Sequence, residues 1–425
     1  MQRNARKKYQ ASRGGSIASY GLTVVLVTTL TQGAGRRSYN SGRIMRAPRI
    51  SILLMLIVAA ILRAQALERV TVAQLEQRLA AQPAPPADKP MQALRDSQIA
   101  EMLGSLELTE RLNSARLGRI YQKLAPGEHS KEALQILADR SAFLDPPGDE
   151  MPTLAPPDAE TQKRLIATAG SNVLKNLRRL PNFFATRTTV SYSGVPADMN
   201  RNEMALRVGV FKEGEASREI TFRDGEEVID PMKPKADDEE IGAGLESWGE
   251  FGPEPMVILM DAAHSSIEFH HWENMPTGVV AVFHYAVPRL GSHYDVHYRC
   301  VANEPFHDNP AYHGSFSIDP ETGALMRITL ETESRPGDPI THIASIIEYS
   351  PMVIGERNYV CPVRSLATVV EEVGACAARH HNPRLDQPVL WINASGFTDY
   401  HRLGSTARIV ENGVDKPAPA EEKQK

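Results

Sequence analysis

The sequence has few cysteines and no long apolar run beyond residue 66. Its three cysteines, Cys300, Cys361 and Cys376, show neither CxxC nor zinc-type spacing, so they do not indicate a cysteine metal site. In an oxidising compartment, Cys361 and Cys376 would close a loop of about 15 residues, which would stabilise the fold by on the order of 3 kcal/mol. Three unpaired thiols fit the sequence equally well. No stretch after Ala66 is long and apolar enough to span a membrane.

Common catalytic signatures are also lacking. Ser365 and Ser395 have no GxSxG context, and the glycines at 242 and 244 do not form a phosphate-binding loop pattern. Asp399 and His401 lie two residues apart, which in a strand indicates only a shared face. The sequence therefore names no catalytic residue.

Residues 45–66 have the pattern of a secretory signal peptide. A basic start is followed by an apolar stretch, residues 50–62, interrupted only by Ser51, and then by an A-x-A sequence at 64–66. A stretch of thirteen residues, twelve of them apolar, is short for a membrane anchor. We therefore expect cleavage before Leu67 and a periplasmic or extracellular protein.

Residues 1–44 carry eight Lys or Arg and no acidic residue. One interpretation is a mis-called start, with Met45 as the true initiator. The other is a long basic leader with a second apolar stretch at 21–30, which is too short and too polar to span a bilayer.

Removal of residues 1–66 makes the chain strongly acidic. These residues contain eleven Lys or Arg and no Asp or Glu, so the formal net charge changes from -5 to -16. A basic field for nucleic-acid binding is therefore not expected. The remaining residues suffice for one large domain or two smaller ones.

The first part of the mature chain, residues 67–144, has helical periodicity, with a proline-rich break at 83–90. A second proline-rich segment, residues 145–157, indicates an extended linker. Asp158 then has the position of an N-cap before one amphipathic helix of about 20 residues that ends near Pro181. The apolar positions of that helix are Ile166, Ala169, Val173, Leu177 and Leu180.

From Phe183 onward the apolar pattern alternates with period two, which is typical of strands. Asp224-Gly225 is a hairpin signal, and residues 319–323 form a longer turn signal. Residues 253–263 fit either a short buried helix or a strand. Because strand follows strand without repeated crossover helices, we expect an antiparallel sheet. The strand segments are 183–192, 205–212, 217–222, 279–287, 293–301, 325–333 and 343–349.

The predicted fold class is therefore α+β. It consists of a helical region (67–144), the linker (145–157), and a large antiparallel sheet domain (158–410) that is curved or partly closed, with a long helix packed on it. Residues 411–425 are charged and predict a disordered tail.

Eight of the 13 histidines fall between His264 and His313. His293 and His297, on one strand face, would lie about 13 Å apart at 3.3 Å per residue, too far for a zinc ion with bonds of about 2.0–2.1 Å. His270 and His271 are adjacent and so should point to opposite faces. A site would need partners across strands, for example His284 and His293. The favoured interpretation is a polar sheet face, with no metal and no cofactor.

Several segments together resemble a group of uncharacterised secreted proteins of acidobacteria. They are 180–189 (LPNFFATRTT), 247–252 (SWGEFG), 310–319 (PAYHGSFSID), 359–365 (YVCPVRS) and 397–400 (FTDY). The resemblance covers residues 67 to about 409 and implies no activity. In architecture alone, a helix leading into a long antiparallel meander is similar to periplasmic lipoprotein carriers of the LolA/LolB type, which hold acyl chains under a curved sheet.

The leading functional expectation is non-catalytic binding of an apolar or lipid-like ligand, or of an envelope partner, in the concavity of the sheet. The alternatives are a secreted hydrolase that uses the histidine-rich strands and a structural envelope component. The expected ligand-binding residues are Phe184, Val190, Tyr192, Ile166 and Val173.

Overall fold

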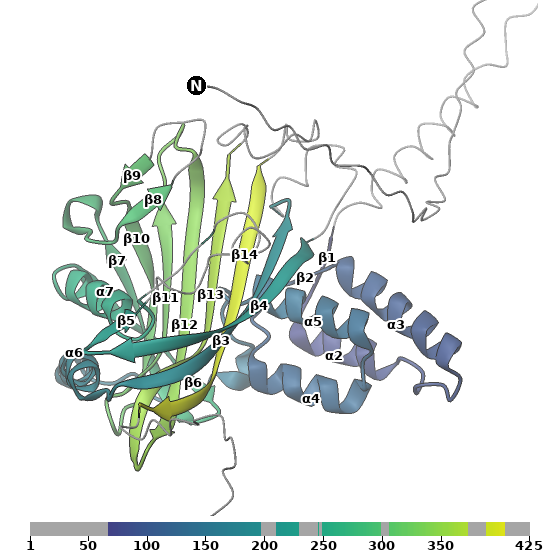
Figure 1. Cartoon of the computed structure of the whole chain (residues 1–425), viewed down its shortest axis with the longest axis horizontal. Coiled ribbons are helices and arrows are strands. Elements are labelled where there is room, and N and C mark those ends of the chain that lie inside the picture. The colour runs from purple at the N-terminus through teal and green to yellow at the C-terminus, as the bar shows by residue number, and fades with distance from the viewer. Residues whose placement is uncertain are drawn as a thin grey trace, which may run out of the picture. The chain divides into compact units, whose positions relative to one another are not determined.

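The computed structural model of the protein describes residues 67–196, 210–228, 245, 249–298, 306–372 and 388–403 (Figure 1). The leader (1–44), the signal peptide (45–66) and the tail (411–425) lie outside these residues. Within them the chain is a mixture of helices and one large antiparallel sheet, which confirms the α+β prediction. No helix of this described part is both long and apolar enough to cross a membrane.

The N-terminal region is helical, as its periodicity predicts. Its helices share a core of their own that includes Leu75, Leu103, Leu117 and Leu134, each 6% exposed or less. Two short parallel strands join the same core. The elements are β1 (Glu68–Val70), α2 (Val72–Ala80), α3 (Lys89–Gly104), β2 (Leu106–Leu108), α4 (Ser114–Leu124) and α5 (Glu128–Arg140).

The proline-rich segment 145–157 is held at several points along its length. Arg116 of α4 forms an ion pair with Asp149, and Asn113 donates a hydrogen bond of 2.6 Å to Glu150. Farther along, the indole Nε1 of Trp272 donates to the carbonyl of Ala155 at 2.9 Å. The linker is therefore fixed to both the helices and the sheet domain.

Ten strands form the main sheet, in the order β5-β4-β3-β14-β13-β12-β11-β10-β7-β6. Every neighbouring pair is antiparallel, and the two edges, β5 and β6, do not pair, so the sheet is not closed into a barrel. The strands are β3 (Phe183–Gly194), β4 (Val210–Arg223), β5 (Glu226–Val228), β6 (Ser266–Met275), β7 (Gly278–Val287), β10 (Ala311–Ile318), β11 (Leu325–Glu333), β12 (Ile340–Ile354), β13 (Arg357–Glu371) and β14 (Val389–Arg402).

The predicted turns are present. Asp224 and Gly225 join β4 to β5 with φ of 56° and 92°, the left-handed values that a tight hairpin turn requires. Gly323 has φ of 67°, and a Cβ there would lie 2.4 Å from the side chain of Thr168. A larger residue at 323 would therefore meet both strain and a clash.

The strand predicted at 293–301 begins later than expected. Among its described residues, 293–298, Val296–Tyr298 (β8) is a strand that pairs with Phe306–Asp308 (β9) in a separate two-stranded sheet, and residues 299–301 lie outside the described part. His293 precedes the strand, and its Nδ1 lies 2.6 Å from a carboxylate oxygen of Asp261. His293 and His297 therefore do not share a strand face.

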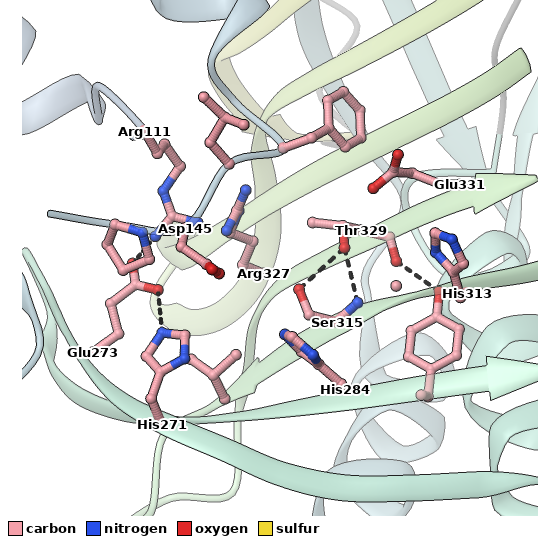
Figure 2. Close-up of a pocket in the computed structure, with 16 residues that line it drawn as sticks. Arg111, Asp145, His271, Glu273, His284, His313, Ser315, Arg327, Thr329 and Glu331 are labelled. Carbon is pink, nitrogen blue, oxygen red and sulfur yellow. Dashed lines mark hydrogen bonds and ion pairs between the residues drawn. The ribbon is translucent and has the colours of Figure 1, made fainter. Parts of the chain in front are cut away.

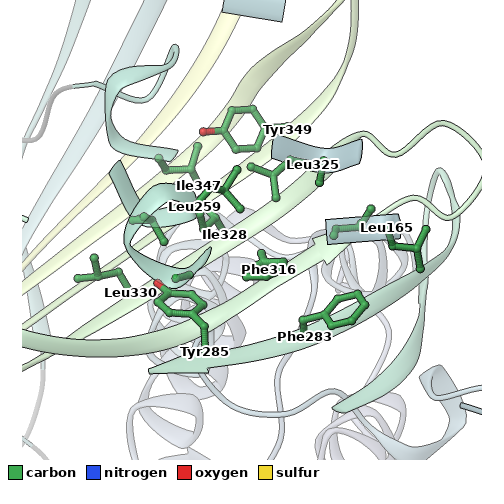
Figure 3. Packing of buried hydrophobic residues seen from close by; sticks show 14 of the residues in the cluster. Leu165, Leu259, Phe283, Tyr285, Phe316, Leu325, Ile328, Leu330, Ile347 and Tyr349 are labelled. Carbon is green, nitrogen blue, oxygen red and sulfur yellow. The ribbon is translucent and has the colours of Figure 1, made fainter. Parts of the chain in front are cut away.

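One face of the sheet is covered by α6 (Ala159–Arg179) and α7 (Pro253–Ala263) (Figure 3). Leu165 of α6 and Leu259 of α7 pack with Phe283 and Phe316 from the strands in one buried cluster. The long amphipathic helix is thus confirmed, and the ambiguous segment 253–263 is a helix.

The opposite face carries residues from the N-terminal region. Ala142 packs with Tyr192 and Ile346, and Arg364 donates a hydrogen bond of 2.5 Å to Asp139 of α5. Val280 and Val282 share this face and are 1% and 3% exposed, as their alternation predicts. Both faces of the sheet are therefore largely filled by the chain's own side chains.

Cys361 is a buried free thiol on β13. Burial raises the pKa of this thiol to about 12, so the group is unreactive at neutral pH. Cys300 and Cys376 lie outside the described residues.

Candidate functional site

A polar cleft of about 280 Å³ opens on the sheet face that carries the N-terminal region (Figure 2). The strands β6, β7, β10 and β11 form its floor, and residues 143–146 form one wall. Its chemically functional lining residues are Arg111, Asp145, His271, Glu273, His284, His313, Ser315, Arg327, Thr329 and Glu331.

Strand register brings the floor residues together. His284 lies directly opposite Ser315, and His313 lies opposite Glu331. Because side chains alternate along a strand, these residues all point to the face away from Phe283 and Phe316. His284 and His313 are 29 residues apart in the sequence, but they lie close together in the sheet.

An irregularity in β6 changes the directions of His270 and His271. The register with β7 shifts between Phe269 and His271, so His270 is an extra residue in the ladder. The Nδ1 atoms of His270 and His271 consequently lie 2.6 Å apart. The expectation that these two side chains point to opposite faces is therefore wrong.

Asp145, His270 and His284 form a possible metal-binding set. One ligand atom from each lies within 4.8 Å of the other two. The hydrogen bond between the Nδ1 atoms of His270 and His271 leaves Nε2 of His270 for a metal ion. Two imidazoles and one carboxylate suit a divalent transition-metal ion such as zinc.

The protonation state of His284 also favours metal binding. Burial, reinforced by the neighbouring His270, lowers the pKa of His284 below its ordinary value. Neutral imidazole is the form that binds metal, so this shift keeps His284 available over a wider pH range.

Two contacts fix the wall of the cleft against its floor. Arg111 forms an ion pair with Glu273 of β6 in which both side chains are almost fully buried. Arg327 of β11 donates a hydrogen bond of 2.5 Å to the carbonyl of Ala142. Asp145, in this wall, lies three residues after Ala142. Its position therefore depends on these contacts, which other side chains make.

The cleft does not contain an assembled nucleophile and base. The hydroxyl of Ser315 lies 3.0 Å from the hydroxyl of Thr329. The backbone N–H of Ser315 also donates a hydrogen bond of 2.8 Å to the Thr329 hydroxyl. Within the described residues, no histidine hydrogen-bonds Ser315. The geometry therefore gives no support to a serine hydrolase.

A second set of the same donor types lies on the β8–β9 hairpin, outside the cleft. Asp295 bonds Nε2 of His297 at 2.6 Å and Nε2 of His307 at 2.5 Å. His297 and His307 are directly opposite across the two strands, and all three side chains are about half exposed.

The five expected ligand-binding residues do not line one cavity. Ile166 and Val173 pack at the edge of the cluster under α6 and α7. Val190 and Tyr192 pack on the other face with Ala142. Phe184 is half-buried on β3 and lies at an alternate position to Phe183.

Of these five residues, Val173 lines a second cleft of about 240 Å³ beside α6. Phe251, Leu325 and Tyr349 contribute apolar surface, and Lys175 and Arg179 also line the cleft. This space is amphiphilic, in contrast to the polar cleft.

Sequence reasoning missed Asp145 because it lies in a proline-rich segment without periodicity. It also paired His284 with the wrong histidine, since nothing in the sequence marks the irregularity at His270. In the comparisons with known proteins, no family model, curated protein or solved structure matches this chain.

Proposed function

We propose that this chain is an exported protein that binds a divalent transition-metal ion at Asp145, His270 and His284. The observation that carries the proposal is the convergence of their three ligand atoms within 4.8 Å, on three exposed side chains of which Asp145 and His284 line the polar cleft. It replaces the expectation of a metal-free polar face.

The donor set also indicates how the ion would be used. Structural zinc sites are usually closed by four protein ligands, whereas catalytic sites keep a position open for water or substrate. Three protein ligands beside a cleft fit the second kind. A bound ion would polarise a ligand or activate a water there, which gives the hydrolase alternative a metal-assisted form.

Zinc titration by calorimetry tests the proposal. The second donor set is first removed by His297→Ala and His307→Ala, and this background should bind one zinc ion per chain. Adding His270→Ala and His284→Ala should abolish that binding. Adding His293→Ala instead should leave it unchanged, because His293 contacts Asp261 and lies outside the cleft.

Zinc binding that survives the His270→Ala, His284→Ala pair would overturn the proposal. So would the absence of binding in a background whose circular dichroism matches that of the parent.

A second candidate function is binding of a small amphiphile in the cleft beside α6. Val173 and neighbouring apolar residues would contact a short chain, and Lys175 and Arg179 would attract an anionic head group. The volume of about 240 Å³ is below the range of about 300–1,000 Å³ typical of ligand pockets, so the chain would be short.

Displacement of an apolar fluorescent probe by octanoate tests this candidate. Val173→Trp should fill the cleft and weaken displacement at least tenfold. Val190→Trp, on the opposite face, serves as the control. Equal effects of both substitutions, or no saturable probe binding, would contradict an amphiphile site beside α6.

A further inference from the structure

We infer that the polar cleft binds a small anion with carboxylate or phosphate oxygens, held between the metal ion and Arg327. The inference rests on the proposed function and adds the chemical class of the ligand. It is supported by the residues that line the cleft and by their charges, in addition to the three proposed metal ligands.

Arg327 is a buried cation without a matching carboxylate. It is 5% exposed, and its Nε has no hydrogen-bond partner. Within the part of the chain that the structure describes, no carboxylate forms an ion pair with it, since its cross-strand neighbour Glu348 pairs with Arg364 instead. A buried charge is costly unless an opposite charge accompanies it.

Arg327 shares the cleft with two of the three proposed metal ligands. It lines the same cleft as Asp145 and His284, and Figure 2 shows Arg327 on the same side of the cleft as Asp145. Guanidinium groups match the planar oxygens of carboxylate and phosphate well.

The charge of the loaded cleft favours an anion. Arg111 and Glu273 neutralise each other in their ion pair. A divalent ion and Arg327 then supply more positive charge than Asp145 and Glu331 supply negative charge. An anion at the open metal position would reduce this excess.

Polar groups on the floor would complete the site. The Ser315 hydroxyl and the ring of His313 line the cleft between the metal set and Glu331. A volume of about 280 Å³ limits the ligand to a small molecule rather than a polymer or a lipid chain.

The test uses cobalt(II) in the His297→Ala, His307→Ala background, because its visible absorption changes when an anion enters the coordination sphere. Inorganic phosphate and acetate are titrated separately into the cobalt-loaded protein. We expect a saturable spectral change with at least one of them, and the tighter of the two identifies the preferred oxygen donor.

Arg327→Gln should weaken this anion binding at least tenfold more than it weakens cobalt binding, which is titrated in the same variant because Arg327 also holds the carbonyl of Ala142 near Asp145. Arg327→Lys, which keeps the charge, should retain most of it. Arg335→Gln, at an exposed position, is the matched control for loss of one positive charge and should have little effect. If Arg327→Gln does not fold, Arg327→Lys together with Ser315→Ala provides the comparison, and Ser315→Ala should weaken binding severalfold.

Cobalt binding that neither anion perturbs would overturn the inference and leave the proposed function intact. Equal weakening by Arg327→Gln and Arg335→Gln would also overturn it, since a general charge effect would then explain the binding. A failure to bind cobalt at all would overturn the proposed function and the inference together.

Discussion

The imidazole rings of His270 and His284 stack with centroids 3.8 Å apart and planes 14° apart, although the two residues belong to different strands. The stacking depends on the register shift in β6, which adds one residue to that strand opposite β7. The bulge thus brings the two rings together across the strands. Because an imidazole nitrogen binds a metal in the plane of its ring, the stacked rings must rotate apart before both can bind one ion.

Zinc affinity at the cleft should depend on pH through His284. Protons compete with the metal for imidazole, and the lowered pKa of His284 delays that competition. We expect affinity to be nearly constant above the ordinary histidine pKa of about 6.5 and to fall below it. Competition with a chromophoric chelator from pH 5 to 8 would measure this. A profile that falls only above pH 7 would contradict neutral histidines as the ligands.

Glu254 should make the protein less stable as the pH rises. Burial of its carboxyl group, together with the nearby Glu250, raises the pKa of Glu254 to about 8. The folded state therefore keeps a proton that the unfolded state releases above its own pKa of about 4.5, so this stabilising contribution is lost between about pH 4.5 and 8.

Glu254→Gln mimics the protonated acid and can still accept the hydrogen bond that Ser345 donates. We expect it to stabilise the fold by on the order of 2 kcal/mol at pH 8 and to have little effect at pH 4. Urea unfolding at both pH values would measure the difference. An equal effect at the two pH values would show that Glu254 does not titrate in this range.

The Arg111–Glu273 ion pair should show strong coupling in a double-mutant cycle. Both side chains are almost fully buried, so either single substitution to Met leaves a buried charge. Each should destabilise by about 3–5 kcal/mol, and the double Met variant should recover most of that loss. Additive losses in chemical unfolding would mean that the pair does not interact in solution.

Gly314 should tolerate no side chain. A Cβ at this position would lie 2.0 Å from the carbonyl oxygen of Thr329 and 2.8 Å from the hydroxyl of Tyr285, which donates to that carbonyl. Gly314→Ala should therefore destabilise by about 3 kcal/mol or more. Gly170→Ala, in α6 with no atom near its added methyl group, should instead stabilise by about 0.5–1 kcal/mol. Thermal unfolding of the two variants would compare them directly.

The sequence by itself determined the helices and most of the strands. Ile166, Ala169 and Val173 recur at helical spacing, and α6 forms from Ala159 to Arg179. Alternation likewise predicted the shared, buried face of Val280 and Val282. These features follow from backbone geometry and solvent exposure, which act over a few residues and so leave a local pattern.

Only the tertiary structure decided the site. The bulge at His270 and the docking of Asp145 above β7 have no local signal, because each depends on packing between segments far apart in the chain. Long-range packing also places Val173 and Val190 on opposite faces of the sheet. Alternation in the sequence predicts that a strand has two faces, but it does not predict which segment covers each face. Local physics thus determined the elements, whereas long-range packing determined which functional groups meet.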